Sequence, residues 1–426
     1  MPVSNLVEYL THRWGFQVDL SREWVIKASK FCNLRCKYCY EWNELGDRER
    51  MSLSLWAKIF DTIRDLSERA EQATGQTPTD IIVWHGGEPT ALPKSYLEDV
   101  VRLQHERFPR AWFESGRIKN RLQTNLYALS DDKMEFLKRN DFGIGVSFDI
   151  VPGARLDIRG APTEERVLAN MRRLEAHGIR PRFLVVIAAH TAQSIDHVYE
   201  FLRDRGQPCR LLPLFDGPDE RSLDGVEADR ATINAALMHM FRRWFEDGCP
   251  FSVRLFDEYL MVVGLKMLGL TRGFRYDRRV IGDKIFLVNL DGRIYQPCTD
   301  YSDEFAMGNL ATQSIDEIFA SSLYASSLKR DDETRRAVCE PCEYYEACGA
   351  KEMFMANDGG ARQDRCMTAQ PLYRAIEQYL IEQGVNARAL SSYVPDALKE
   401  LGYSGSDQTK GRAPSGSADL AVSMPA

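Results

Sequence analysis

Length, composition and charge limit the class of protein that this chain can be. Its 426 residues suffice for one domain of roughly 200 to 250 residues and a smaller second one. The 55 basic and 62 acidic residues give a net charge of −7, so a nucleic-acid scaffold is not indicated. The N-terminus lacks a signal-peptide pattern, and the best apolar run, 260–270, is short and interrupted by Lys266. We predict a cytoplasmic protein that binds neither nucleic acid nor a membrane.

Strands and helices are expected to alternate over the first half of the chain. The run 24–29 alternates like a strand and leads into a cysteine-rich loop. Parallel strands need crossover helices, so this order predicts an α/β fold, a partial (β/α)6 barrel of the TIM type, with its chemistry at the carboxyl ends of the strands. The further strands are expected at 80–85, 118–123, 143–148, 181–187 and 209–215, and the helices at 52–67, 94–107, 131–139, 163–177 and 194–205.

The loop after the first strand carries three cysteines, Cys32, Cys36 and Cys39, in the order Cys-x3-Cys-x2-Cys. Three thiolates leave one iron of a 4Fe-4S cluster without a protein ligand, and that iron can bind a small molecule. The alternatives are a zinc loop or three buried thiols, but zinc motifs usually pair Cys-x2-Cys with a second pair. The ten cysteines of the chain cluster at metal-type spacings, which favours metal ligation in a reducing compartment over disulfides.

Polar residues follow the next three predicted strands. The turn Gly86-Gly87-Glu88-Pro89 has glycines that allow a close backbone approach and a carboxylate that suits a ligand ammonium group. Its alternative interpretation is an ordinary glycine turn, and the later residues are alternatively helix caps. The candidates after strands three and four are Asn125, Ser147, Asp149 and Arg159.

The second half of the chain predicts a separate cysteine-rich module. Two apolar runs around Asp291-Gly292 indicate a hairpin over 285–298 that ends on Cys298. Four thiolates would close a cluster completely, which suits electron transfer, and the alternative is a structural zinc site. Helices are expected at 229–247, 253–270 and 369–383. The four thiols are Cys339, Cys342, Cys348 and Cys366.

The first cysteine loop, with Tyr38 before its last cysteine, and the Gly-Gly-Glu-Pro turn together resemble the radical S-adenosylmethionine (radical SAM) superfamily. The downstream cysteines resemble the SPASM extension of its peptide-modifying members. The resemblance implies a SAM-binding 4Fe-4S cluster on Cys32, Cys36 and Cys39. It implies SAM contacts from Tyr38, Gly86, Gly87, Glu88, Pro89, Asn125, Ser147, Asp149 and Arg159. It also implies one auxiliary 4Fe-4S cluster on Cys339, Cys342, Cys348 and Cys366.

The chain departs from the family pattern at several positions. Gln313 and Glu352 stand where the family has cysteine ligands of a first auxiliary cluster, of which Cys298 alone remains. Ser314 stands where sulfatase maturases carry an acidic base, which lowers the expectation of sulfatase maturation. Leu126 and Ile150 replace glycines that usually follow Asn125 and Asp149, so the second of these turns is expected to differ.

We therefore predict a radical SAM peptide maturase. Such an enzyme cleaves SAM to a 5′-deoxyadenosyl radical and oxidatively modifies a peptide, by a side-chain crosslink or a dehydrogenation in a ribosomally made natural product. The alternatives are oxidation of a small alcohol or sugar, sulfatase maturation, and a non-catalytic iron-sulfur scaffold. The predicted domains are an N-terminal extension (1–23), the barrel (24–225), a helical bridge (226–282), the SPASM-like module (283–383) and a disordered tail (403–426).

The expected partners follow from this chemistry. They are a precursor peptide or protein substrate and a low-potential electron donor of the flavodoxin or ferredoxin type. The extension 1–23 is too short for a leader-binding domain, so recognition is expected from the barrel mouth, the bridge, or a separate leader-peptide-binding protein.

Overall fold

The computed structural model describes residues 21–214, 225–271, 285–295, 305–348, 366, 369–386 and 404–405. Most of the predicted N-terminal extension and C-terminal tail, together with Cys298 and Glu352, lie outside these residues. Within the predicted tail, Ser404–Gly405 (β11) pairs with Leu270–Thr271 (β7).

The centre of the molecule is a parallel sheet, as the sequence predicts. Six strands follow one another side by side, each parallel to the next, in the order β1 to β6. All the carboxyl ends therefore lie at one edge, so the loops that carry the predicted motifs meet there. The strands are β1 (Arg22–Ser29), β2 (Asp80–Gly86), β3 (Ile118–Thr124), β4 (Gly143–Ser147), β5 (Arg182–Ile187) and β6 (Cys209–Pro213).

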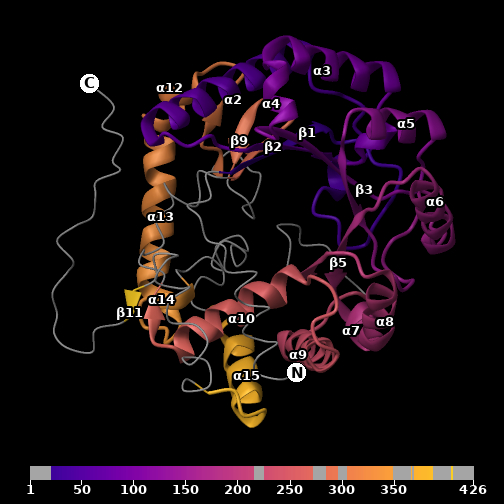
Figure 1. Cartoon of the computed structure of the whole chain (residues 1–426). Helices are drawn as coiled ribbons and strands as arrows, with labels where there is room; N and C mark the ends of the chain where they lie inside the picture. Colours follow the sequence, from indigo (N-terminus) through magenta and orange to yellow (C-terminus); the bar gives the residue numbers. More distant parts are fainter. Residues whose placement is uncertain are drawn as a thin grey trace.

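The crossover helices form an outer arc around these strands (Figure 1). Alternate strand residues, such as Trp24 and Trp84, are fully buried and belong to the main core, where Trp56 of α2 lies 5.0 Å from Trp84 between ring centroids. The strand residues between them point to the opposite, inner face of the sheet. The helices are α2 (Leu53–Thr74), α3 (Lys94–Arg107), α5 (Asp131–Arg139), α6 (Glu164–Ala176) and α8 (Ile195–Arg205), with the short α4 (Arg110–Glu114), α7 (Ala189–Gln193), η1 (Trp42–Glu44) and η2 (Pro89–Ala91) between them.

The predicted hairpin is present, but it does not stand apart from the barrel. Strands β8 (Ile285–Val288) and β9 (Arg293–Tyr295) pair antiparallel, and β8 also pairs parallel with β1. With β10 (Gly308–Asn309) the sheet has nine strands in the order β10-β9-β8-β1-β2-β3-β4-β5-β6. Phe286 stacks on Trp24 with ring centroids 4.3 Å apart, so an apolar contact fixes this junction.

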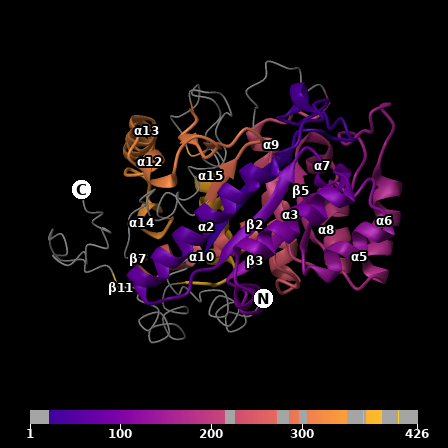
Figure 2. The same cartoon turned by 90° about the horizontal axis from the view of Figure 1, so that it is seen from above.

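The remaining helices belong to the second half of the chain, and among them α9 packs against α7 and α8. In Figures 1 and 2, α12 and α13 lie away from α5 and α6, and α10 lies beside α15. Aromatic rings join these helices, since Tyr259 and Tyr373 have centroids 4.8 Å apart and Phe241 lies 6.1 Å from Tyr379. The helices are α9 (Arg230–Glu246), α10 (Arg254–Met267), α12 (Ile315–Phe319), α13 (Ser322–Val338), α14 (Tyr345–Cys348) and α15 (Ala369–Glu382).

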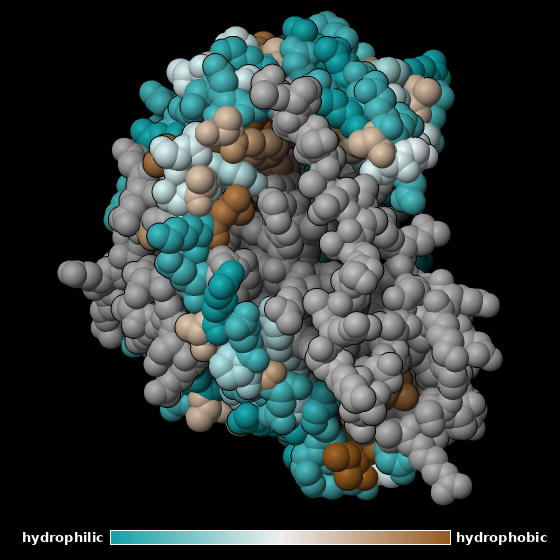
Figure 3. Space-filling view, turned by 90° about the vertical axis from the view of Figure 1, so that its left-hand side faces the viewer, coloured by the Kyte–Doolittle hydropathy of each residue, from teal (hydrophilic) through white to brown (hydrophobic). Residues whose placement is uncertain are grey.

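The described surface is mostly polar on the face seen in Figure 3, where apolar colouring is confined to small separate areas. Among the described helices, none is both long and apolar enough to span a bilayer.

Candidate active site

The first cysteine loop is braced by its neighbours in the fold. The Cys32 N–H donates to the Leu45 carbonyl at 3.1 Å, and the N–H groups of Arg35 and Lys37 donate to the carbonyls of Leu156 and Ala154 at 2.7 and 2.9 Å. The loop therefore sits between the segment that follows it and the segment that follows β4. Cys32 and Cys36 are buried and Cys39 is half-buried.

The three thiols fit an iron-sulfur cluster better than they fit an unoccupied protein interior. Burial raises the pKa of Cys32 to about 12 and that of Cys39 to about 11, so isolated thiolates are disfavoured and bound iron would offset that cost. Two donors already point at one sulfur: the Leu34 N–H lies 3.4 Å and the Asn125 Nδ2 lies 3.6 Å from Cys32 Sγ. Such hydrogen bonds stabilise a metal-bound thiolate.

The paired glycines are required by the cysteine loop itself. A Cβ at Gly86, whose φ is +121°, would lie 2.0 Å from the Ser29 carbonyl oxygen, and one at Gly87 would lie 2.2 Å from that of Lys30. The Gly87 and Glu88 N–H groups donate to the Ser29 and Phe31 carbonyls at 2.9 and 2.8 Å. The close approach expected toward a ligand is therefore seen here as a backbone contact between this turn and the loop.

Glu88 is the centre of a buried hydrogen-bond network. Its Oε1 accepts from the Thr90 N–H (3.0 Å), the Thr90 hydroxyl (2.6 Å) and the Thr124 hydroxyl (2.7 Å), and its Oε2 accepts from the Asn125 N–H (2.7 Å). Asn125 in turn reaches the sulfur of Cys32 and donates to Asn33 Oδ1 at 2.9 Å. The structure thus joins three predicted site residues, Cys32, Glu88 and Asn125, in one connected group.

A second network joins Tyr38 to the segment after β4. The Tyr38 hydroxyl donates to Asp149 Oδ2 at 2.5 Å and accepts from Arg155 Nη1 at 2.9 Å. Burial raises the pKa of Tyr38, and although burial alone would lower the pKa of Arg155, its anionic neighbours raise it overall. The predicted arginine, Arg159, is exposed, and Arg155 is the one that the structure brings to Asp149.

Ser147, the remaining predicted site residue, ends β4 and accepts a hydrogen bond from Gln123 Nε2 at 2.7 Å. His190 of α7, which the sequence analysis did not single out, has its Nε2 3.4 Å from Asp149 Oδ2. No motif identified His190 or Arg155, because their positions depend on loops whose course is set by the fold.

The inner face of the barrel holds a charged group that the motifs did not reveal. Lys27 of β1 is 1% exposed and pairs with Glu41, just beyond the cysteine loop. His85 lies near both charges, and burial lowers its pKa to about 4. A lysine within the mostly apolar run 24–28 of β1 was the signal that could have located this pair.

The turns after β3 and β4 each hold a residue with a side chain at positive φ. Leu126 has φ +55° and Ile150 has φ +75°, both in the left-handed region. This conformation costs a side-chain-bearing residue about 1 to 2 kcal/mol. Both side chains are buried, and that burial offsets the cost.

Three of the downstream cysteines, Cys339, Cys342 and Cys348, lie in or beside the turn between α13 and α14, and Cys366 is half-buried. Cys339 and Cys348 are buried, and the Cys342 N–H donates to the Cys339 carbonyl at 2.9 Å. Gln370 Nε2 lies 3.6 Å from Cys342 Sγ, and the Tyr373 hydroxyl lies 3.5 Å from Cys348 Sγ. In the described part of the chain, no three His, Cys, Asp or Glu side chains are grouped so as to hold a single metal ion.

The two departures near residue 313 have structural roles. Gln313 Oε1 accepts from the Asn309 N–H at 2.9 Å, which closes the turn after β10. Ser314 is the N-cap of α12, where it accepts from the Glu317 N–H at 3.2 Å in a capping box. Neither side chain is available in this structure as an additional ligand or base.

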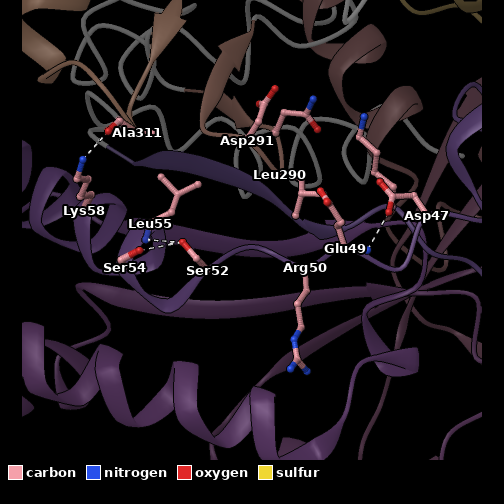
Figure 4. Close-up of a pocket in the computed structure, with 12 residues that line it drawn as sticks. Asp47, Glu49, Arg50, Ser52, Ser54, Leu55, Lys58, Leu290, Asp291 and Ala311 are labelled. Carbon is pink, nitrogen blue, oxygen red and sulfur yellow. Dashed lines mark hydrogen bonds between the residues drawn. The ribbon is translucent and has the colours of Figure 1, made fainter.

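A cavity of about 500 Å³ lies between the segment after the cysteine loop, the start of α2 and the β8–β9 turn. Figure 4 shows Lys58 directed to the Ala311 carbonyl and Arg50 pointing away from the other lining side chains. Arg50 lies over the ring of Tyr96 at 5.1 Å. The remaining charged lining residues include Asp47, Glu49 and Asp291, so the cavity is polar and is shared by the barrel and the hairpin.

Comparison with known proteins identifies the class that this fold and site define. The model of the radical SAM superfamily matches residues 26–204, and the model of an iron-sulfur cluster-binding domain, SPASM, matches residues 280–343. The chain therefore contains a radical SAM domain and a SPASM domain. These domains indicate an enzyme that catalyses an oxidoreductase-type radical reaction. They imply a 4Fe-4S cluster, auxiliary clusters and SAM as cofactors.

The relatives point to one group within that class. A cysteine-type anaerobic sulfatase-maturating enzyme of Clostridium novyi (strain NT) is 25% identical, over 75% of this chain and 84% of the relative. A serine-type enzyme of Bacteroides thetaiotaomicron is 24% identical, over 75% of this chain and 79% of the relative. The solved structure of native anSMEcpe with bound AdoMet has a TM-score of 0.63 and 18% identity, over 87% of this chain and 98% of that one. The fold is therefore that of this group.

Proposed function

We propose that this protein oxidises a side chain of a peptide or protein substrate, forming a crosslink or a dehydrogenated residue. The observation that carries the proposal is the connected group of Cys32, Asn125 and Glu88, beside Tyr38 and Asp149, at the carboxyl edge of the parallel sheet. Cluster ligands and buried polar groups at this edge suit a bound SAM molecule better than they suit an inert scaffold.

Different residues of the chain bind different chemical groups of SAM in this proposal. Glu88 Oε1 accepts three hydrogen bonds from the protein, whereas Oε2 accepts one, so Oε2 keeps acceptor capacity for the SAM ammonium group. Asp149, oriented by Tyr38, and Ser147 are positioned for ribose hydroxyls, and Arg155 supplies a buried cation for a carboxylate. Once bound, the three-thiolate cluster supplies the electron that cleaves SAM to a radical able to take a hydrogen atom from carbon.

The substrate class rests on the relatives and on the surroundings of residue 314. The named relatives mature sulfatases, and anSMEcpe has been solved with the Cp18Cys peptide, which supports a peptide substrate. Sulfatase maturation is the second candidate function, and the activity of these relatives favours it. Ser314 and Gln313 are engaged in structural hydrogen bonds, so this chain offers no acidic base at that position. We therefore favour a peptide modification other than sulfatase maturation.

The four downstream cysteines complete the proposed electron path. Abstraction of one hydrogen atom leaves a substrate radical, which must lose a further electron and a proton to give a two-electron-oxidised product. We propose that Cys339, Cys342, Cys348 and Cys366 would hold an auxiliary 4Fe-4S cluster. Full cysteine ligation would leave no open iron for substrate, so the group would supply an acceptor for that electron. The first electron comes from a flavodoxin- or ferredoxin-type donor.

Iron analysis combined with product analysis tests this proposal. Anaerobically reconstituted protein should contain about eight irons per chain, and the triple variant C32A/C36A/C39A about four. Wild-type enzyme with SAM and dithionite should remove two hydrogens from a precursor peptide encoded beside its gene, and the triple variant should not. A sulfatase-derived peptide and a small alcohol serve as comparison substrates. Turnover of the small alcohol alone would overturn the peptide substrate, and turnover of the sulfatase-derived peptide alone would replace the favoured modification by sulfatase maturation. About four irons in the wild type would overturn the second cluster.

A further inference from the structure

Helix α15 begins three residues after Cys366 and presents two donors to the sulfurs of the downstream cysteines. Gln370 Nε2 donates to Cys342 Sγ over 3.6 Å, and the Tyr373 hydroxyl lies 3.5 Å from Cys348 Sγ. Gln370 and Tyr373 are three residues apart, so both project from one face of the helix. One helix face therefore contacts two of the four proposed ligands.

The position of the Tyr373 hydroxyl is fixed by packing. Tyr373 is 2% exposed, and its ring lies 5.1 Å from Tyr344 and 4.8 Å from Tyr259 between centroids. The Tyr344 hydroxyl donates to Glu377 at 2.5 Å, and Lys266 pairs with the same carboxylate at 2.5 Å. The Tyr344 hydroxyl is hydrogen-bonded to Glu377. Of these two tyrosines, Tyr373 is therefore the one whose hydroxyl contacts the cysteine sulfur.

Ligation determines the direction of both hydrogen bonds. A thiolate bound to iron has no proton, so Tyr373 must donate to Cys348, and the amide of Gln370 already donates to Cys342. Hydrogen bonds to cluster sulfurs stabilise the more negative, reduced state more than the oxidised state, and they raise the reduction potential.

We infer that Gln370 and Tyr373 are positioning residues that raise the reduction potential of the auxiliary cluster and so suit it to accept the electron left on the substrate. This inference rests on the proposed function, because that function places the cluster on these four cysteines and makes it the electron acceptor. It adds the two side chains that tune the cluster, neither of which is a ligand.

Redox titration of the reconstituted holoenzyme, followed by electron paramagnetic resonance, tests the inference independently of turnover. Tyr373→Phe removes the hydroxyl and keeps the ring packing, and Gln370→Leu removes the amide donor. Each should lower the equilibrium constant for reducing the auxiliary cluster about tenfold, a shift of about 59 mV for one electron. Tyr379→Phe is the matched control: it removes a hydroxyl from the same helix whose partner is Glu246, 2.9 Å away, and it should leave the potential unchanged.

The outcomes separate this inference from the function on which it rests. If the wild type lacks a second cluster signal, the proposed ligand set is wrong and the inference is overturned with it. If the signal is present and neither Tyr373→Phe nor Gln370→Leu lowers the potential relative to Tyr379→Phe, the tuning role alone is overturned. Lower potentials in both variants, with unchanged iron content, support it, because a merely structural role would not move the potential.

Discussion

Replacement of Glu88 by Gln separates a ligand role for this residue from its role in the fold. The glutamine side chain has the same shape but only one acceptor oxygen. It therefore cannot accept both the three hydrogen bonds that Glu88 Oε1 accepts and the one that Oε2 accepts from the Asn125 N–H. If the amide nitrogen faces Asn125, a buried N–H loses its acceptor, at about 1 to 3 kcal/mol, and the remaining hydrogen bonds lose their charge assistance. We expect the free energy of unfolding to fall by roughly 2 to 4 kcal/mol without SAM.

Urea unfolding of the SAM-free protein under anaerobic conditions measures this loss, and equilibrium dialysis measures SAM affinity. Glu343→Gln is the control, because its carboxylate is exposed and pairs at the surface with Arg374, and such solvent-screened pairs contribute little to stability. If Glu88 also contacts the SAM ammonium, affinity should fall roughly ten- to hundredfold. A Glu88→Gln variant as stable as the control would refute the assignment of these buried hydrogen bonds to the fold.

Three further predictions concern residues near the site. Lys27→Met should cost about 3 to 5 kcal/mol of stability because it leaves Glu41 buried and unpaired, and Lys27→Met/Glu41→Leu should recover most of that loss in the same unfolding assay. His85 has a folded pKa of about 4 against 6.5 ordinarily, so the unfolded chain binds the extra proton between these values. The free energy of unfolding should therefore fall by up to about 3 kcal/mol as pH drops from 6.5 to 4. This contribution to the pH dependence should be absent in His85→Gln. If the wild type and His85→Gln lose stability equally over this pH range, His85 is in contact with solvent. Ser314→Ala should lower the free energy of unfolding by about 1 kcal/mol, whereas Ser314→Asp, an equally good N-cap, should lower it little. A loss of peptide turnover in Ser314→Asp at normal stability would contradict a purely structural role of Ser314.

Local pattern was sufficient for the elements of the barrel and for two of the site networks. The strands and helices from β1 to β6 lie within a few residues of their predicted ranges, except that α2 continues to Thr74, because period-2 and period-3.6 patterns are encoded locally. The structure joins Cys32, Glu88 and Asn125 by hydrogen bonds, and their roles toward a ligand stay predictions. Their predicted proximity followed from the shared carboxyl edge of a parallel sheet.

Long-range geometry accounts for what the sequence did not reveal. The pairing of β8 with β1 joins residues that are more than 250 positions apart, and it depends on the contact of Phe286 with Trp24. Arg155 replaces Arg159 beside Tyr38 because the course of the loop after β4, rather than a motif spacing, determines which arginine is buried. Ile150 holds a left-handed turn without glycine, since burial of its side chain offsets the strain.

Transfer of deuterium from substrate to product tests the central claim most directly. The reconstituted enzyme would be incubated with SAM, dithionite and a precursor peptide deuterated at its side-chain carbons, and 5′-deoxyadenosine and peptide would be analysed by mass spectrometry. The account predicts 5′-deoxyadenosine that carries one deuterium, formed together with a peptide that has lost two hydrogens. Unlabelled 5′-deoxyadenosine beside an unchanged peptide, with label transferred instead from a deuterated small alcohol, would contradict it.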